Sequence, residues 1–425
     1  MFMKRRDQLL AQFLKRQFGM KLRDAYSKLR ADLLDDVESV ACNLCGSDEY
    51  VQVASRDKYD LPVVSVMCRQ CGLMYLRPRP SIASYDRFYT QGGDDDSVYH
   101  VNLRFGDVEA FLKRCLGADF EMNKAARKAL ILYARGELAE HEGRAAVSAM
   151  SDDTVLGELE HRARAWEMRR YELYAAHLYA YFGEFVPRGG TFFEMGAGTG
   201  KLLEPWRDKH GCEVTGIEPR QQTVKEVRER LKIDLFEGFP GSADIPEGAY
   251  DAVLTARTIN HMVDPLGDLR HAWRWLKPGG RLLIDISDTI REAHYEGFEN
   301  NVVEVDHPYM FSLQTLSAMV QKAGFEIEKR DIIDTRHVFW GDRKAAEVKQ
   351  IRLVARKSLD EVKVDWPDPV QQLAELLASQ LARDSLQTTR IARLQATNRN
   401  LKTRNRERTL KSVWEGGVWQ RLGHR

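Results

Sequence analysis

Three glycines alternate with other residues in the segment EMGAGTG at 194–200, and this spacing constrains the fold more than any other feature of the chain. A strand-like apolar run precedes the segment, and a helical pattern that begins near Lys201 follows it. Glycine allows the backbone to turn sharply and to approach a ligand closely. A dinucleotide fingerprint would need a further glycine at position 201, so the loop is not of the NAD-binding kind. A tight turn without a ligand is the simpler alternative.

From Thr191 onward, short apolar runs alternate with helical stretches, which is typical of a parallel, doubly wound α/β sheet. The second apolar run ends at Glu218, whose carboxylate can accept hydrogen bonds from both hydroxyl groups of a ribose. A solvated acid at a helix entry is the alternative for this residue. The predicted strands are residues 191–195, 213–217, 233–236, 251–255, 281–286, 325–333 and 350–355.

The order of these motifs resembles that of class I S-adenosylmethionine (SAM)-dependent methyltransferases. The glycine loop has the E-x-G-x-G-x-G spacing of that family, and AYDAVL at 249–254, NHMVDP at 260–265 and LKPGGRL at 276–282 follow in the family's order. The resemblance spans residues 181–357 and implies a Rossmann-like, seven-stranded sheet. It also implies enzymatic methyl transfer with SAM as the cofactor.

The same resemblance assigns the cofactor contacts. The three glycines would pass under the methionine part of SAM, Glu194 would face its amino group, and Glu218 would hold its ribose. No direct carboxylate contact to the adenine amino group is expected, because the nearest residues after the third strand are 238–239 and 242–243. The residues expected to bind the cofactor are Glu194, Gly196, Ala197, Gly198, Gly200, Glu218, Phe239 and Thr255, the last as part of the cavity floor.

Four of the six cysteines form two C-x2-C pairs, which predicts a structural zinc site with a closed shell of four thiolates. The predicted ligands are Cys42, Cys45, Cys68 and Cys71. Cys115 and Cys212 have no partner at useful spacing and are interpreted as small apolar residues. Residues 71–81, CGLMYLRPRPS, resemble the N-terminal zinc-binding module of bacterial methyltransferases that act on nucleotide sugars and related saccharides. This resemblance places a zinc ribbon at 37–102.

Methyl transfer to a hydroxyl, amine or carbon acid needs a group that removes the acceptor's proton. His261 follows the fourth predicted strand, where ligands of doubly wound folds bind. Glu304, His307 and Tyr309 precede a late helix that folds over the substrate side in the family. Sugar C-methyltransferases carry a tyrosine at the position of Glu304, so O- or N-methylation with His307 or Glu304 as base is the favoured chemistry. Each histidine also has a purely structural alternative, as a turn cap or a loop brace.

The remaining segments are helical by pattern. Residues 1–36 predict a basic amphipathic helix, 103–180 a helical insert that covers the site, and 358–425 a linker followed by a basic helical extension with weak heptad spacing. The basic ends are candidates for contact with a membrane surface, an acidic partner or a second copy of the chain. The charged N-terminus has no signal-peptide core, and no apolar run is long enough for a membrane span, so a cytoplasmic location is expected, with the inner membrane face as an alternative.

These features predict a SAM-dependent methyltransferase whose acceptor is a sugar, a nucleotide sugar or a surface saccharide. One alternative is an rRNA or tRNA methyltransferase, but the formal net charge of +1 and the acids near the zinc ribbon do not suggest a nucleic-acid partner. A second alternative is a non-catalytic, SAM-binding assembly protein that acts through its helical ends. The acceptor, the methylated atom and the oligomeric state stay open at the level of the sequence.

Overall fold

The structure is a computed structural model. Most of the basic helix expected at 1–36 and most of the C-terminal extension lie outside the residues it describes, and the described end of the former holds a short 3-10 helix, η1 (Asp32–Leu34). No helix among the described residues is long and apolar enough to cross a membrane. The described residues are 30–90, 143–296, 302–335 and 349–379, with isolated positions at 27, 124, 127, 128, 131, 132, 135, 138, 139 and 381.

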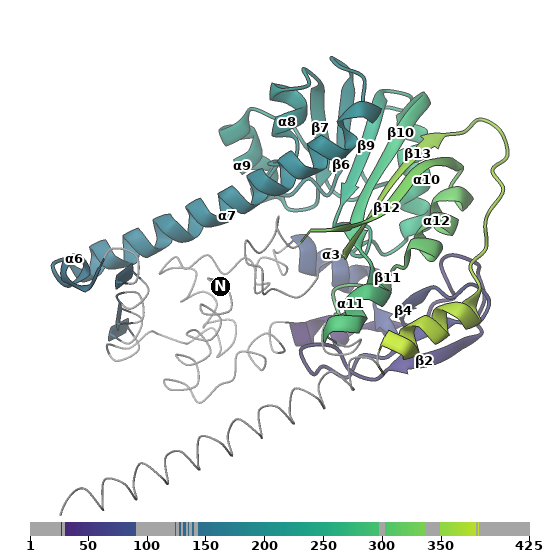
Figure 1. The fold of residues 1–425 in the computed structure, drawn as a ribbon, viewed down its shortest axis with the longest axis horizontal. Helices are drawn as coiled ribbons and strands as arrows, with labels where there is room; N and C mark the ends of the chain where they lie inside the picture. Colours follow the sequence, from purple (N-terminus) through teal and green to yellow (C-terminus); the bar gives the residue numbers. More distant parts are fainter. Residues whose placement is uncertain are drawn as a thin grey trace, which may run out of the picture.

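A seven-stranded sheet forms the centre of the molecule (Figure 1), in the order β12-β13-β10-β9-β6-β7-β8. The five strands from β10 to β8 are parallel, while β13 runs antiparallel between β10 and β12. This topology confirms the predicted Rossmann-like α/β fold. The strand bounds are β6 Thr191–Met195, β7 Glu213–Glu218, β8 Phe236–Glu237, β9 Tyr250–Ala256, β10 Leu276–Ser287, β12 Phe325–Asp334 and β13 Lys349–Lys357.

Helices cover both faces of the sheet. Successive side chains of a strand point to opposite faces, and in this sheet both faces are apolar. Phe192 packs with α7 and α8 on one face, while Phe193 packs with α10 and α12 on the other. The helix after the glycine loop begins later than expected, because residues 201–203 form a turn. The helix bounds are α7 Asp152–Phe182, α8 Glu204–Asp208, α9 Gln221–Leu231, α10 Pro265–Trp275, α11 Thr289–Glu296 and α12 Leu313–Lys322.

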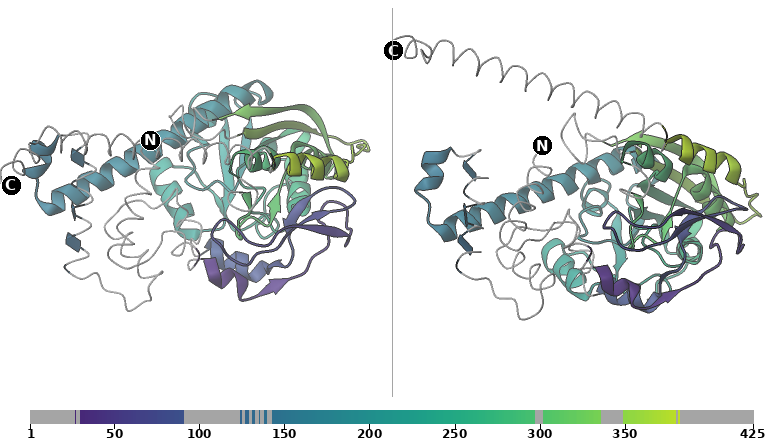
Figure 2. Two further views of the ribbon diagram at one scale, coloured as in Figure 1. Left: turned by 60° about the horizontal axis from the view of Figure 1, so that its bottom comes forward. Right: turned by 90° about the horizontal axis from the view of Figure 1, so that it is seen from below.

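The N-terminal cysteine-containing segment shares a sheet and a core with the rest of the chain. Figure 2 shows it, in purple, packed against the green part of the ribbon. Its four-stranded sheet has the order β11-β4-β3-β2, and β11 (Tyr309–Met310) lies in the sequence between β10 and β12 of the large sheet. Two shorter strands and a helix, α3 (Ile82–Thr90), complete this module. Because β11 lies two residues after His307, the module is directly connected to the segment that carries this histidine. The other strands are β1 Val37–Glu38, β2 Tyr50–Ala54, β3 Ser65–Cys68, β4 Met74–Leu76 and β5 Arg79–Pro80.

Helix α7 is much longer than the sheet is wide and extends well beyond it (Figure 1). Ser151 caps its start by accepting a hydrogen bond from the amide of Thr154. Asp152 and Asp153 lie in the first turn, where their negative charges stabilise the N-terminal end of the helix through the helix dipole. Its other end packs Leu178 and Phe182 into the core of the sheet. The described C-terminal part of the insert predicted at 103–180 is therefore continuous with the first helix of the α/β unit; most of residues 103–142 lie outside the described residues. A short helix, α6 (Arg144–Ser148), precedes α7.

Candidate functional site

The glycine loop connects β6 to the turn before α8, and each of its three glycines has a positive φ angle: 72° at Gly196, 48° at Gly198 and 70° at Gly200. A Cβ atom at Gly196 would lie 2.4 Å from the side chain of Thr258, whereas a Cβ atom at Gly198 would meet open space. A Cβ atom at Gly200 would collide with Val227 of α9. Gly200 therefore supports helix packing and does not line the site, contrary to its predicted place under the methionine part of SAM.

A cavity of about 560 Å³ borders this loop, and six of the eight residues predicted to bind the cofactor line it. Thr255 does not, because it is fully buried within β9. The floor is formed instead by Ala256, Arg257 and Thr258, where the strand ends and the backbone of Arg257 has a φ of 55°. The predicted residues that line the cavity are Glu194, Gly196, Ala197, Gly198, Glu218 and Phe239.

Two carboxylates define the end of the cavity near the loop. Glu218 accepts a hydrogen bond from the amide of Gly198 at 3.0 Å and another from the amide of Arg220 at 3.2 Å. Glu194 is 1% exposed, and its Oε2 atom has no hydrogen-bond partner among the described residues. Burial, and then the nearby charge of Glu218, raise the pKa of Glu194 well above its usual range. A buried carboxyl group that lacks a donor fits the ammonium group of SAM, so these residues fit the cofactor that the fold implies.

His261, Glu304 and His307, three of the candidate catalytic residues, lie next to one another and line the same cavity. The two histidine rings lie edge to face, with centroids 4.3 Å apart. His307 Nδ1 lies 3.6 Å from Glu304 Oε1, and the same oxygen forms an ion pair with Lys58. Burial lowers the pKa of His307 to about 4, so its imidazole is neutral at physiological pH. Neutral imidazole is the form that can accept a proton.

Tyr89 determines the tautomer of His261. The tyrosine hydroxyl lies 2.7 Å from the carbonyl oxygen of Asp306 and 2.9 Å from His261 Nδ1. A carbonyl oxygen can only accept, so the single hydroxyl hydrogen goes to Asp306. His261 Nδ1 must then carry a hydrogen and donate it to the tyrosine oxygen. Whenever the ring is neutral, this arrangement leaves its lone pair on Nε2.

Asp306 is buried beside His307 and lies 3.4 Å from Arg30, itself fully buried. Burial opposes the charge of Asp306, but Arg30 and the two histidines hold the pKa of this carboxyl below its usual range. The sequence did not point to Asp306, Lys58 or Tyr89. Lys58 and Tyr89 lie in the N-terminal module, and their proximity to His261 and His307 depends on how that module docks.

Tyr309, a predicted catalytic residue, lies outside the cavity. Its hydroxyl accepts a hydrogen bond from Arg79 Nη1 at 2.9 Å, and its ring stacks on Tyr75 with centroids 6.3 Å apart. Tyr309 thus contacts the N-terminal module through β11 and β4. The position of β11 in the four-stranded sheet accounts for this difference from the prediction.

The family model described as "Methyltransferase domain" matches residues 165–330. The chain therefore carries a SAM-dependent methyltransferase domain. Among similar curated proteins, the O-methyltransferase resE of Aspergillus sclerotiorum is 27% identical over 159 residues, covering 34% of this chain and 59% of that protein. A probable S-adenosylmethionine-dependent methyltransferase of Mycolicibacterium smegmatis is 26% identical over 154 residues, covering 36% and 56%.

A third relative, the ubiquinone biosynthesis O-methyltransferase of Paramagnetospirillum magneticum, is 34% identical over 114 residues, covering 24% of this chain and 45% of that protein. The chain spans about three fifths of the length of the first two relatives. A solved SAM-dependent methyltransferase from Thermotoga maritima, described as a possible histamine N-methyltransferase, is 23% identical. The structural alignment covers 47% of this chain and 95% of the Thermotoga maritima chain, with a TM-score of 0.36.

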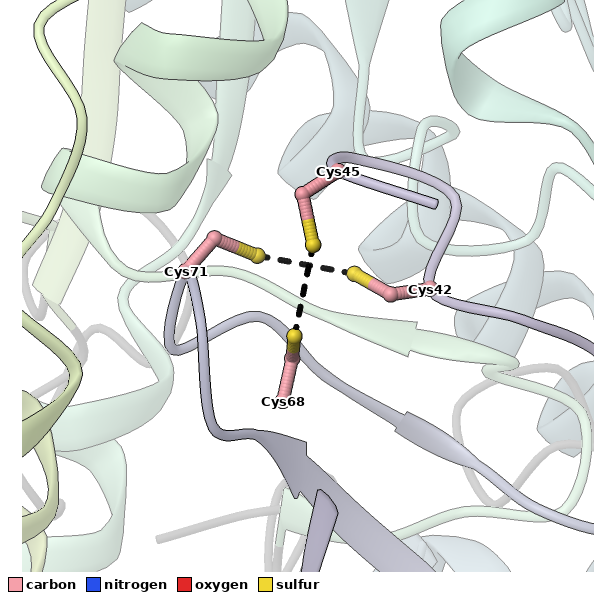
Figure 3. Close-up of side chains that lie close together, drawn as sticks. All are labelled: Cys42, Cys45, Cys68 and Cys71. Carbon is pink, nitrogen blue, oxygen red and sulfur yellow. Dashed lines mark hydrogen bonds between the residues drawn. The ribbon is translucent and has the colours of Figure 1, made fainter. Parts of the chain in front are cut away.

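The four predicted zinc ligands of the module beside the methyltransferase domain converge on one point (Figure 3). The Sγ atoms of Cys42 and Cys71 lie 3.5 Å apart, and those of Cys45 and Cys68 lie 3.4 Å apart. Four thiolates about 2.3 Å from one zinc would lie roughly 3.8 Å from one another, so the observed cluster is close to a tetrahedral zinc shell. No disulfide joins these cysteines. The donor set fits a structural zinc with no open position.

Proposed function

We propose that the protein transfers a methyl group from SAM to a hydroxyl group of a sugar or saccharide held between the methyltransferase domain and the N-terminal module. The observation that carries this proposal is that one cavity is lined both by the glycine loop with Glu218 and by His261 with His307. The names of the O-methyltransferase relatives support a hydroxyl acceptor. The choice of a sugar rests on the resemblance of residues 71–81 to the zinc module of saccharide methyltransferases.

The charge of the cavity lining supports a neutral acceptor group. Seven carboxyl-bearing side chains line the cavity, against the two cations Lys58 and Arg257. Phosphate groups are disfavoured in such a lining, so the nucleotide part of a nucleotide sugar would remain outside the cavity. The same lining is unfavourable for an RNA backbone, which is usually bound by clustered lysine and arginine. The carboxyl-bearing residues are Asp86, Glu194, Glu218, Asp264, Asp268, Glu304 and Asp306.

The proposed mechanism assigns the proton to His261. When bound, SAM supplies an electrophilic methyl group that needs no further activation. His261 Nε2 would accept the hydrogen of the acceptor hydroxyl, while its other ring nitrogen remains bonded to Tyr89. Glu304 and Lys58, joined as an ion pair, position the acceptor and His307 beside this ring. His307 is the alternative base, because it is neutral and lies against His261.

The direct test is methyl transfer from labelled SAM to a panel of free sugars, nucleotide sugars and lipid-linked saccharides, with total RNA run in parallel. The proposal predicts label in one saccharide class and none in RNA. Label in RNA alone would reject the sugar acceptor and favour an RNA methyltransferase. Binding of SAM without transfer to any of these acceptors would instead favour a non-catalytic role.

A further inference from the structure

Arg79 in β5 is a buried cation of the N-terminal module that the proposed mechanism does not use. The residue is 6% exposed. Its Nε and Nη2 atoms both donate to Glu38 Oε1, at 3.0 and 2.9 Å, across the paired strands β1 and β5. This ion pair holds one edge of the guanidinium within the module and leaves the two hydrogens of Nη1 for other acceptors.

The Nη1 group of Arg79 contacts two segments that come much later in the sequence. It donates to the backbone carbonyl oxygen of Val263 at 2.5 Å and to the hydroxyl oxygen of Tyr309 at 2.9 Å. The tyrosine hydroxyl in turn donates to the same carbonyl oxygen, at 3.4 Å. Four of the five guanidinium hydrogens are thus used, and one buried side chain joins Val263 to Tyr309.

The two joined segments carry the two histidines that line the cavity. Val263 comes two residues after His261, in the connection between β9 and α10. Tyr309 comes two residues after His307 and begins β11. The two imidazole rings are in edge-to-face contact. Their relative placement therefore depends on how these segments are held together, and the buried guanidinium bonds to both.

The connection between β9 and α10, residues 257–264, depends on such contacts because it contains no helix or strand. Its first residue, Arg257, donates its amide hydrogen to a carbonyl oxygen of β10 at 2.7 Å. Its last residue, Asp264, caps α10. The bond from Arg79 acts between these two ends, on the stretch that follows His261. Loss of this bond should therefore loosen the connection while both of its ends stay in place.

We propose that Arg79 is a positioning residue, which fixes the ring of His261 against the ring of His307. The proposal rests on the proposed function, since it takes His261 as the base. Arg79 does not line the cavity, so it acts through Val263 and Tyr309 and not by contact with the reacting groups. It also gives Tyr309, which was expected to be catalytic, a role in holding the two segments together.

The chemistry of the side chain explains why arginine suits this position. A hydrogen bond from a charged donor is stronger than one from a neutral donor, and here the donor is shielded from water. The planar guanidinium presents its hydrogens in a fixed fork, whereas the ammonium of lysine is a point charge on a flexible stem. Lysine could keep the ion pair with Glu38, but it could not hold the two later segments in the same geometry.

The first test observes the protein itself and needs no acceptor. In ¹⁵N NMR of the full chain, the Nδ1 hydrogen of His261, which bonds to Tyr89, should give a defined signal. Arg79→Met should broaden or shift this signal. Tyr309→Phe removes only the hydroxyl group and should cause a smaller change in the same direction, because the bond from Arg79 to Val263 remains.

Amide exchange followed by mass spectrometry tests the connection directly. In Arg79→Met, residues 257–264 should exchange roughly 10- to 100-fold faster, the range expected from loss of one hydrogen bond to a charged group. The amides of α10 should exchange as in the wild type, because Asp264 still caps this helix. Metal analysis should find the same zinc content in every variant, which separates this effect from damage to the cysteine cluster.

Kinetics separate positioning from stability. With the saccharide that the acceptor panel identifies, Arg79→Met should lower kcat by up to roughly 100-fold, the effect of misplacing a reacting group by about 1 Å. Binding of S-adenosylhomocysteine should change much less. Arg79→Lys keeps a positive charge beside Glu38, so it should lower the melting temperature less than Arg79→Met and still lower kcat.

Arg77→Met is the matched control. Arg77 also bonds to a carbonyl oxygen and a carboxylate, those of Val40 at 2.8 Å and Asp48 at 2.9 Å, but both partners lie in the N-terminal module. This variant should keep the wild-type His261 signal and exchange pattern. An unchanged signal and unchanged exchange in folded Arg79→Met would overturn the positioning role. If Arg79→Met does not fold, the same outcome in the Tyr309→Phe variant decides against it.

The two proposals fail separately. If the wild-type protein transfers no methyl group to any acceptor of the panel, the proposed function is rejected. The NMR signal and the exchange rates do not depend on that result, so they still decide whether Arg79 holds the two segments together.

Discussion

At the scale of single residues, His261 and His307 differ in what surrounds their ring nitrogens. His261 has one nitrogen fixed by Tyr89, which leaves the lone pair on the other. We expect His261→Ala to lower kcat by roughly 10²- to 10⁴-fold, the usual contribution of one general base. Tyr89→Phe should lower kcat less and allow both tautomers, which ¹⁵N NMR of the imidazole would detect. A larger loss of kcat in His307→Ala than in His261→Ala would contradict the assignment of the base.

The low pKa of His307 also predicts how stability depends on pH. Because the folded-state pKa of about 4 is below the usual value of 6.5, the unfolded chain takes up a proton first as the pH falls. His307 therefore contributes stability that is complete above about pH 6.5 and is lost as the pH falls toward 4, by up to about 3 kcal/mol. In urea unfolding between pH 4 and 7.5, the free energy of unfolding of His307→Asn should fall less steeply with decreasing pH than that of the wild type. Parallel curves for the variant and the wild type would contradict this prediction.

Glu218 is the residue on which the cofactor site depends most clearly. Glu218→Ala should weaken binding of SAM by roughly 1.5–3 kcal/mol, because it removes a charged acceptor and leaves the amide of Gly198 without its partner. Calorimetry on the full chain measures this effect. Glu226→Gln is a suitable control, since this glutamate is exposed on α9 and does not line the cavity. Equal losses in the two variants would contradict a specific role for Glu218.

At the scale of elements, α7 is held to the sheet by a buried polar network. Tyr174 donates to Asp285 at 2.6 Å, and Arg352 forms an ion pair with the same carboxylate at 2.7 Å. Asp285 and Arg352 are 0% and 1% exposed, so each depends on the other for compensation of its charge. Tyr174 also lines the cavity, which connects this network to the site.

Breaking this ion pair should cost far more than a surface substitution. Arg352→Met leaves Asp285 charged and buried, and we expect a loss of roughly 3–5 kcal/mol in the free energy of unfolding. Arg356→Met is the control on the same strand, because Arg356 is 43% exposed in its side chain and its ion pairs are at the surface. Its loss should be at most about 1 kcal/mol in urea unfolding. Similar losses for both variants would show that the network does not secure α7.

At the scale of the whole molecule, the N-terminal module with its four-cysteine cluster and the methyltransferase domain form one unit. Cys68, Leu73 and Tyr75 pack in the same core as Leu316 of α12, and β11 completes the module's sheet. The module reaches the cavity through α3, through residues 58–59 between β2 and β3, and through residues 304–307 just before β11. A substitution in the module should therefore affect acceptor binding and turnover more strongly than it affects cofactor binding.

Removal of the metal tests this coupling. Cys45→Ser should lose about one zinc per chain and lower the melting temperature, since metal affinity contributes to folding free energy. Binding of S-adenosylhomocysteine should weaken only a few-fold, while kcat falls strongly because the segment before β11 loses its support. Metal analysis, thermal unfolding and calorimetry distinguish these effects. Cys212→Ser, outside the cluster, should retain its zinc, and a wild-type melting profile in metal-free Cys45→Ser would overturn the assignment.

The sequence alone determined the features that depend on local pattern. Short apolar runs between helical stretches predicted all seven strands of the large sheet. The third was expected three residues too early and the fifth five residues too late, since β8 begins at Phe236 and β10 at Leu276. The glycine spacing identified the loop, because the positive φ angles of Gly196 and Gly198 belong to a local backbone turn that favours glycine. The paired cysteines likewise predicted their own cluster, because zinc ligation uses short spacings.

The tertiary structure decided which distant residues face the cavity. Lys58 and Tyr89 reach His261 and Glu304 only because the N-terminal module docks through β11, and no local periodicity encodes that contact. Thr255 and Gly200 were misplaced for a related reason: the side on which a residue at the end of a strand or loop emerges depends on the twist of the sheet and on its packing against α9. Local sequence patterns predict backbone conformation. A site built from several segments depends on how those segments pack together, and here they are hundreds of residues apart in the sequence.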